Sequence, residues 1–322
     1  MKRLAVFTSG GDAPGMNAAI RAVVRVGLYH GLEVFGIMRG YQGLIQGEFV
    51  TMGPRSVSNI VHRGGTILKT SRSKEFETEA GRRKAKRQLE NFRIDALIAI
   101  GGNGTYRGAI ELGKIWKGRM LGAPGTIDND LYGTDFTIGY DTANNTAVEA
   151  IDKIRDTADS HERVFIVEVM GRDAGFIALE VGIGGGAEEV LIPETKTSIA
   201  QVARHLKEAG KKGKTSSILI VSEGDEEGGA YDVAKKLEAR TGQSFRVLVL
   251  GHLQRGGSPT ALDRRLATEL GAYAVEQAIA GKTGVAVGLL HGRLALTPLR
   301  EAVEKKKTLD PYLLKILPAL AS

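Results

Sequence analysis

The chain has 322 residues, of which 42% are hydrophobic and 25% are charged, a composition typical of folded globular domains. It contains no cysteine, which excludes disulfides and cysteine metal sites, and no apolar stretch long enough to span a bilayer, so we expect a cytoplasmic protein without membrane contacts. The net charge of +7 favours anionic ligands, and an aromatic content of only 6% argues against nucleic acid as the partner.

Short aliphatic runs alternate with helix-patterned segments along the chain. In chain order we predict a strand at 3–7, a helix at 15–30, a strand at 33–38, a helix at 78–92, a strand at 95–100, helices at 104–117 and 141–159, strands at 164–169 and 188–192, a helix at 199–212, strands at 217–222 and 245–250, and a helix at 258–280. This alternation predicts βαβ units with mostly parallel sheets. Because so many strands exceed one comfortable sheet, we expect two α/β domains.

Three glycine-rich segments follow predicted strands, which is where ligands bind in open α/β sheets. They are TSGGDAPGMNAAIR at 8–21, GGNGT at 101–105 and GHLQRGGSPT at 251–260. The first two lead into predicted helices, so their backbone N–H groups and the helix dipole could bind phosphate. Neither is a Walker A loop or a dinucleotide fingerprint, and a plain strand-to-helix turn is the alternative interpretation.

Two further segments carry charged side chains suited to phosphoryl transfer. In PGTIDND at 124–130, an extended backbone would project Asp128 and Asp130 to one side, where one could accept a proton and the other could hold Mg²⁺. Ordinary turn chemistry is the alternative. Arg172 follows the predicted strand at 164–169 and could stabilise a phosphoryl group, or it is a surface residue. His252 and Arg255 suit a phosphate monoester pocket, or they belong to an ordinary loop.

Together and in this order, these segments resemble the bacterial ATP-dependent 6-phosphofructokinases over essentially the whole chain. The match also includes RGGT at 63–66, GTDFTIGYDTA at 133–143, SHER at 160–163 and VEVMGR at 167–172. The resemblance implies a homotetramer in which each chain has two Rossmann-like three-layer α/β domains with an active-site cleft between them. The larger, nucleotide-binding domain would comprise 1–139 plus 254–304, and the smaller, sugar-phosphate-binding domain 140–253 plus 305–322.

The resemblance further implies the glycolytic transfer of a phosphoryl group from ATP, with Mg²⁺, to the 1-hydroxyl of fructose 6-phosphate. Asp128 would be the general base, Arg172 and Thr126 would steady the phosphoryl group, and Asp130 would assist positioning and metal binding together with residue 103. The nucleotide positions are matched by Gly11, Tyr41, Arg72, Gly102, Asn103, Gly104, Thr105 and Gly108. The sugar-phosphate positions are matched by Met170, Gly171, Glu223, His252 and Arg255, and by Arg163 and Arg246 from a neighbouring subunit.

The resemblance also bears on the phosphoryl donor and on regulation. Pyrophosphate-using relatives carry an Asp and a Lys where this chain has Gly104 and Gly125, so glycine at both positions favours ATP. An effector pocket for ADP or phosphoenolpyruvate would be formed by Arg21, Arg25, Arg55, Arg155, Glu188, Lys212 and Lys214. For the Arg21 and Arg25 pair, a solvated basic helix face is the alternative.

One residue departs from the family pattern at the nucleotide site. The family's second loop usually reads GGDGS or GGDGT, whereas this chain has Asn103 in place of the acidic residue. Asparagine keeps a carbonyl ligand for a metal ion but loses a charge, and the loss of a few kcal/mol in the transition state would slow the reaction roughly 10²–10³-fold. Two functions therefore stay open: an active kinase, or a low-activity or non-catalytic paralogue that binds nucleotide and sugar phosphate as a regulatory protein.

Overall fold

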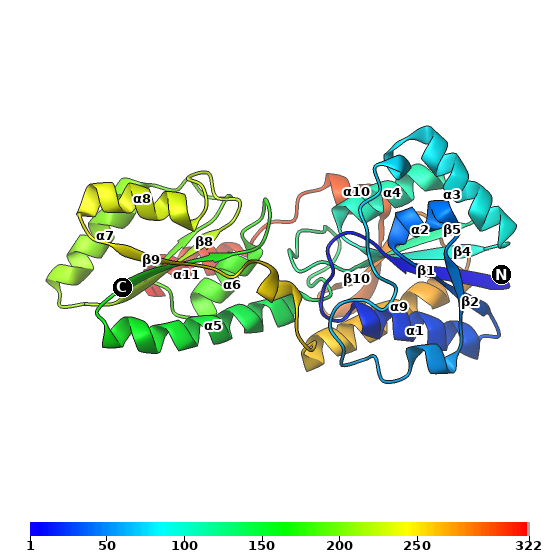
Figure 1. Ribbon diagram of the computed structural model, residues 1–322, viewed down its shortest axis with the longest axis horizontal. Helices are drawn as coiled ribbons and strands as arrows, with labels where there is room; N and C mark the ends of the chain where they lie inside the picture. The colour runs from blue at the N-terminus through cyan, green and yellow to red at the C-terminus, as the bar shows by residue number, and fades with distance from the viewer. Residues whose placement is uncertain (321–322) are drawn as a thin grey trace. The chain divides into compact units, whose positions relative to one another are not determined.

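The computed structural model in Figure 1 describes residues 1–320. The chain forms two compact units, Met1–Thr142 with Arg255–Lys307 and Ala143–Gln254 with Thr308–Ser322. We call them the larger unit and the smaller unit. Each consists of a mostly parallel sheet with helices on both faces, so the predicted α/β fold class is confirmed.

The larger unit is built on a seven-stranded sheet in the order β11-β10-β5-β4-β1-β2-β3. Its strands are β1 (Arg3–Thr8), β2 (Glu33–Ile37), β3 (Phe49–Met52), β4 (Ala96–Gly101), β5 (Arg119–Pro124), β10 (Val285–Leu290) and β11 (Arg293–Pro298). The β2–β3 and β10–β11 pairs are antiparallel, and the other pairs are parallel. The central strand β4 is buried along its whole length because helices cover both of its faces.

Helices cover the two faces of this sheet in separate groups (Figure 1). On one face α1 (Met16–Tyr29) packs on α9 (Ala261–Ile279), and a Cβ atom at Gly271 would lie 2.7 Å from the Ala19 carbonyl oxygen, so glycine permits the close approach. The other face carries α2 (Gly40–Gln46), α3 (Glu79–Asn91), α4 (Asn103–Gly113) and α10 (Leu299–Glu304). Two short 3₁₀ helices, η1 (Pro54–Val57) and η2 (Glu75–Glu77), lie in the connection between β3 and α3.

The smaller unit has a four-stranded, fully parallel sheet in the order β7-β8-β6-β9. Its strands are β6 (Val164–Val169), β7 (Glu189–Leu191), β8 (Ser217–Ser222) and β9 (Phe245–Val249). Its helices are α5 (Tyr140–Ser160), α6 (Phe176–Gly184), α7 (Ile199–Lys211), α8 (Ala230–Thr241), η3 (Gly251–Arg255) and α11 (Pro311–Leu320). Figure 1 shows α7 and α8 on one face of this sheet and α5 and α6 on the other.

Amphipathic spacing explains how the helices of the smaller unit pack. In α7 the buried residues Ile199, Val202, Ala203 and Leu206 recur at intervals of three and four, which places them on one face. They join residues of α8 and of the sheet in a single apolar cluster. The Ser198 side chain caps α7 by accepting a hydrogen bond from the Gln201 N–H at 3.3 Å.

Several helices and strands are not predicted from the sequence patterns. Strand β5 is not predicted because Gly122 and Pro124 interrupt its short apolar run, and the β10–β11 hairpin and helices α6 and α8 are also not predicted. The last long helix starts at Ala261 after the N-cap Thr260, three residues later than the predicted start at 258.

Candidate active site

Three loops of the larger unit meet at one edge of its sheet. Strands β1, β4 and β5 are neighbours, run parallel and are paired up to their carboxyl ends, where Thr8 pairs with Ile100 and Gly101 with Pro124. The chain continues from β1 to β2 on one side of β1 and later returns to β4 on the other side. The loops therefore lie at a topological switch point, the usual ligand position in open α/β sheets.

The first loop is fixed by neighbouring side chains. The Thr105 hydroxyl donates to the Ser9 carbonyl oxygen at 3.0 Å, and the Thr70 hydroxyl donates to that of Gly10 at 2.7 Å. The Arg255 guanidinium donates to the Asp12 carbonyl oxygen at 3.2 Å, and it lies so close to Gly11 that a Cβ atom there would be 2.4 Å from Nη1. Arg255, predicted for the sugar phosphate, thus lies on the loop predicted for the nucleotide.

The second loop opens α4 and directs free backbone N–H groups toward the same edge. Asn103 is the first residue of α4, and Gly102 is its N-cap. The first turn of a helix has unpaired N–H groups and a positive dipole end, which together favour a phosphate. A side chain at Gly104 would meet no other atom within 4 Å, so packing does not require glycine there. Glycine at 104 instead leaves space for a ligand beside the loop.

Tyr41, another predicted nucleotide residue, lies beneath this loop in the core. Its hydroxyl donates to the Thr105 carbonyl oxygen at 2.6 Å, and its ring stacks on Phe76 with 3.9 Å between centroids. Burial raises the pKa of Tyr41 far above its usual value. A Cβ atom at Gly108 would lie 2.7 Å from the Tyr41 ring, so both residues act through packing. Arg72, by contrast, is exposed.

The third loop carries the predicted catalytic residues. Thr126 and Asp128 are buried, and the Asp128 N–H donates to the Thr126 hydroxyl at 3.2 Å. The expectation of an extended segment is wrong at Asn129, which has a left-handed φ of 53° and turns the chain between Asp128 and Asp130. Asparagine tolerates this conformation better than most residues. The Asn103 amide donates to an Asp130 carboxylate oxygen at 2.6 Å, so the two predicted metal ligands are adjacent.

Lys307 is a neighbour of this loop that the sequence analysis missed. Its ammonium donates to the Asn129 side-chain oxygen at 2.9 Å and to the Asp135 carbonyl oxygen at 2.8 Å. Burial lowers the pKa of Lys307 to about 8, although the negative charges of Asp135 and Asp130 act to raise it. Lys307 is the last of three consecutive lysines, and no sequence signal distinguishes it from the other two.

In the smaller unit, the loops after β6 and β8 bring Arg172 and Glu223 together. The Glu223 carboxylate accepts a hydrogen bond from the Arg172 N–H at 2.7 Å. Arg172 has a left-handed φ of 55°, and a Cβ atom at Gly224 would lie 1.9 Å from the Arg172 carbonyl oxygen. Glycine at 224 therefore lets the two loops pack backbone to backbone.

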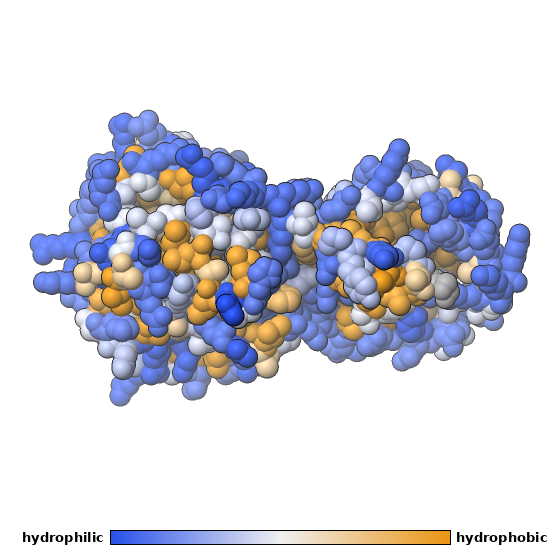
Figure 2. Space-filling model, turned by 180° about the vertical axis from the view of Figure 1, so that it is seen from behind, coloured by the Kyte–Doolittle hydropathy of each residue, from blue (hydrophilic) through white to orange (hydrophobic). Residues whose placement is uncertain are grey.

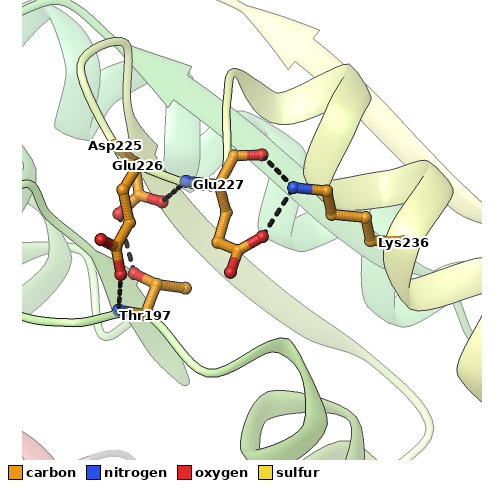
Figure 3. Close-up of polar contacts among 5 residues, drawn as sticks. All are labelled: Thr197, Asp225, Glu226, Glu227 and Lys236. Carbon is orange, nitrogen blue, oxygen red and sulfur yellow. Dashed lines mark hydrogen bonds and ion pairs between the residues drawn. The ribbon is translucent and has the colours of Figure 1, made fainter.

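A polar network braces the loop that carries Glu223 (Figure 3). The buried Asp225 accepts hydrogen bonds from the Thr197 hydroxyl at 2.8 Å and the Glu227 N–H at 2.9 Å. The Glu226 carboxylate accepts from the Thr197 N–H at 3.1 Å, and Lys236 donates to the Glu227 carboxylate at 2.6 Å. The loop after β8 is thus tied both to the segment before α7 and to α8.

The remaining residues predicted to bind the sugar phosphate lie at opposite ends of the small sheet. Gln254 in η3 accepts a hydrogen bond from the Met170 N–H at 2.8 Å, which ties η3 to Met170 and Gly171 at the carboxyl end of β6. His252, also in η3, is exposed. Arg163 directly precedes β6, and Arg246 pairs with Phe165 at the amino end of β9. A six-residue strand is about 20 Å long. One smaller unit therefore does not place Arg163 and Arg246 beside Met170.

The predicted effector residues form one group in each unit. In the smaller unit, the Glu188 carboxylate is 2.8 Å from the Lys214 ammonium and 4.0 Å from Arg155. Glu188, Lys212 and Lys214 line a pocket of about 520 Å³ whose apolar wall includes Leu206 and Leu317. In the larger unit, the Arg25 guanidinium donates to the Pro54 carbonyl oxygen at 3.1 Å, next to Arg55, and Arg21 lies one turn earlier on α1.

Residues 1–320 contain no cluster of three or more His, Cys, Asp or Glu side chains arranged to hold a metal ion. A magnesium ion that is bound mainly by nucleotide phosphates needs only one or two protein oxygens, which Asp130 and Asn103 offer. None of the helices in the described part of the chain is long and apolar enough to cross a membrane.

The chain is similar to known proteins over its full length. It is 58% identical over 321 residues to ATP-dependent 6-phosphofructokinase 1 of Thermus thermophilus, with 100% of both chains covered. It is 53% identical to the ATP-dependent 6-phosphofructokinase of Cytophaga hutchinsonii, with 98% of this chain and 97% of the relative covered.

Solved structures show the same fold. Phosphofructokinase from Saccharomyces cerevisiae superposes with a TM-score of 0.90 at 36% identity, and this chain spans 99% of its own length but only 47% of the yeast chain. A pyrophosphate-dependent phosphofructokinase from Marinobacter aquaeolei shares the fold with a TM-score of 0.85 at 23% identity, covering 97% of this chain and 86% of that one. The family model described as phosphofructokinase matches residues 3–278. The chain belongs to the phosphofructokinase family.

Proposed function

We propose that this protein transfers the γ-phosphoryl group of ATP to the 1-hydroxyl of fructose 6-phosphate, giving fructose 1,6-bisphosphate and ADP, as a cytoplasmic enzyme of glycolysis. The observation that carries the proposal is 58% identity over both full lengths to a relative named ATP-dependent 6-phosphofructokinase. The open space beside Gly104 supports a nucleotide as the donor.

In this proposal Asp128 accepts the proton of the sugar 1-hydroxyl as that oxygen attacks the phosphoryl group. Its burial supports the role, because the surrounding protein holds the carboxylate in one place and keeps bulk water away from the proton that it accepts. Thr126 and Arg172 would stabilise the phosphoryl group through a hydroxyl and a positive charge. Phosphoryl transfer depends mainly on such positioning and electrostatics.

The nucleotide would occupy the edge formed by the first two loops, at Gly11, Gly102, Asn103, Gly104 and Thr105. Tyr41 and Gly108 would support the second loop by packing beneath it, and Arg72 would offer an exposed positive charge. Asp130 and the side-chain oxygen of Asn103 would hold Mg²⁺, which neutralises charge on the phosphates. Both ligands are oxygens, and the amide of Asn103 orients Asp130. A neutral ligand at position 103 is compatible with an active enzyme because Asp130 keeps its charge.

Fructose 6-phosphate would bind through Met170, Gly171, Glu223, His252 and Arg255, with Arg163 and Arg246 supplied by a second copy of the chain. The separation of these two arginines from Met170 along β6 supports a shared site. A homotetramer would also cover α11, which has no fully buried residue, and the apolar side chains that gather over it in Figure 2. Sedimentation analysis should give four chains per particle.

We also propose that ADP or phosphoenolpyruvate regulates the enzyme through Arg21, Arg25, Arg55, Arg155, Glu188, Lys212 and Lys214. Six of these seven residues are cations, which suits a phosphorylated effector. Saturation curves for fructose 6-phosphate that do not respond to either compound would contradict this part of the proposal.

The first test is the steady-state rate of fructose 1,6-bisphosphate formation by the parent chain, Asp128→Asn and Asn103→Asp. We expect turnover by the parent, a 10²–10⁴-fold lower kcat for Asp128→Asn, and a lower Mg²⁺ requirement for Asn103→Asp. An inert parent that becomes active as Asn103→Asp would instead indicate a regulatory paralogue.

A further inference from the structure

A partly buried cation, Lys307, contacts the turn that separates the two candidate catalytic carboxylates. Lys307 lies 178 residues after Asn129 in the sequence, yet its ammonium donates to the Asn129 side chain at 2.9 Å. A second hydrogen bond, to the Asp135 carbonyl oxygen at 2.8 Å, anchors the ammonium on the far side of the same loop. Lys307 therefore bridges two points of the segment that carries Asp128 and Asp130.

Asn129 is the centre of this arrangement. Its side-chain oxygen accepts from the Thr137 N–H at 3.0 Å as well as from Lys307, and its amide donates to the Asp135 carbonyl oxygen at 3.3 Å. Its left-handed backbone, with φ at 53°, sets the direction in which the two flanking carboxylates leave the chain. Fixing the Asn129 side chain thus fixes the turn.

Charge provides a second, independent link to the site. The Lys307 ammonium interacts electrostatically with the carboxylates of Asp135 and Asp130. On its other side Asp130 accepts a hydrogen bond from the neutral Asn103 amide. Residue 103 is neutral in this chain, so Lys307 supplies positive charge near Asp130 that residue 103 does not.

We propose that Lys307 is a positioning residue for phosphoryl transfer: it locks the Asn129 turn that presents Asp128 and Asp130. This inference rests on the proposed function for its effect on kcat. Its effect on the loop itself does not depend on activity. The competing explanation is that Lys307 only attaches the end of the 299–307 segment to the larger unit.

Lys305 offers a matched control. It belongs to the same segment and has the same charge, but it pairs with Glu301 and lies 5.2 Å from the centre of the Tyr132 ring. Substitution of Lys305 by Met removes the ion pair and the contact with the Tyr132 ring of the same loop, but it leaves the hydrogen bonds of Asn129 intact. The test compares Lys307→Met, Lys307→Arg and Lys305→Met in the full chain.

Two measurements are made on each variant: kcat and KM for both substrates, and hydrogen–deuterium exchange of peptides covering 126–137. For Lys307→Met we expect a kcat 30–100-fold lower, KM values within about threefold of the parent, and faster exchange across 126–137. Lys307→Arg should recover most of the kcat, and Lys305→Met should resemble the parent in both measurements.

The outcomes separate the two proposals. Unchanged exchange at 126–137 in Lys307→Met would overturn the positioning role even if the parent proved inert, in which case the proposed function would fail on its own. An active parent whose kcat survives Lys307→Met would overturn the inference alone. Equal losses in Lys305→Met would show that the segment matters only as a structural attachment. Lys307→Gln makes the same comparison if the Met variant does not fold.

Discussion

The loops at the carboxyl ends of the two sheets are fixed by different chemistry. In the larger unit, hydroxyl and amide groups of Thr105, Thr137 and Asn129 hold the backbone of buried loops, and the cations Arg255 and Lys307 donate to the same loops. In the smaller unit, carboxylates accept from backbone N–H groups: Glu223 from Arg172, Glu194 from Gly175, and Glu168 from Ala230.

This contrast suggests a division of labour between rigid and adaptable loops. Buried neutral hydrogen bonds do not respond to salt or to an arriving anion, so Asp128, the proposed general base, would keep its geometry. Carboxylate anchors on partly exposed loops can exchange their backbone partners for water or for ligand groups at low cost. We therefore expect substitutions of the residues that hold the turn at Asn129 to change kcat and stability, and substitutions of the carboxylates that hold the loops of the smaller unit to change KM for fructose 6-phosphate.

The largest effect is expected from breaking the hydrogen-bond network at Asn129, in which Lys307 also takes part. In Asn129→Ala, the Thr137 N–H loses its acceptor and a residue with a Cβ atom but no polar side chain must adopt φ near 53°. The two losses together should destabilise the protein by about 2–4 kcal/mol. Urea unfolding measures this difference.

Asn129→Gly separates the two contributions, because glycine adopts the left-handed conformation freely but makes no side-chain hydrogen bonds. It should be more stable than the alanine variant by about 1 kcal/mol while losing the same hydrogen bonds. A loss below 1 kcal/mol in both variants would contradict a rigid role for the turn.

A smaller effect, on substrate affinity, is expected at Asp225 in the smaller unit. In Asp225→Asn one carboxylate oxygen becomes an NH₂ group that faces either the Thr197 hydroxyl or the Glu227 N–H, both of which donate to Asp225 in the parent. The loop that carries Glu223 should loosen, so KM for fructose 6-phosphate should rise about 3–10-fold with little change in kcat, equivalent to about 1 kcal/mol of binding.

The matched control is Lys236→Met, which removes the ion pair with Glu227 on the outer side of the same loop (Figure 3). Exposed ion pairs contribute little, so this variant should keep its KM within about twofold. A fall in kcat without a change in KM for Asp225→Asn would contradict the division between the two units.

The sequence predicts the larger features of this architecture well. The aliphatic runs at 3–7, 95–100 and 217–222 coincide with β1, β4 and β8 because fully buried parallel strands read as continuous apolar segments. Strand β5 does not read as a continuous apolar segment, since Gly122 and Pro124 give it the composition of a loop. Its position between β4 and β10 comes from pairing with distant strands, which local patterns do not encode.

The site shows the same limit at the level of single residues. The motif PGTIDND identifies the carboxylates but not the left-handed turn at Asn129, because the turn depends on Thr137 and Lys307. Of the three lysines at 305–307, tertiary contacts alone select the one that turns inward. Sequence patterns therefore miss residues that act indirectly, through their contacts with other residues.

The smallest effects are expected from a pair of buried tyrosines in the larger unit. The Tyr41 hydroxyl donates to the Thr105 carbonyl oxygen at 2.6 Å, whereas the Tyr106 hydroxyl has no hydrogen-bond partner within the described chain. Tyr41→Phe should therefore cost about 1 kcal/mol of stability and raise KM for ATP slightly, because Thr105 belongs to the second loop. Tyr106→Phe removes an unpaired buried hydroxyl and should be neutral or stabilising by up to about 1 kcal/mol. A melting temperature that falls in Tyr41→Phe and is unchanged or higher in Tyr106→Phe would confirm that only the hydrogen-bonded hydroxyl stabilises the larger unit. Equal losses would mean that the Tyr106 hydroxyl has a partner, and that the larger unit holds a second polar contact beneath α4.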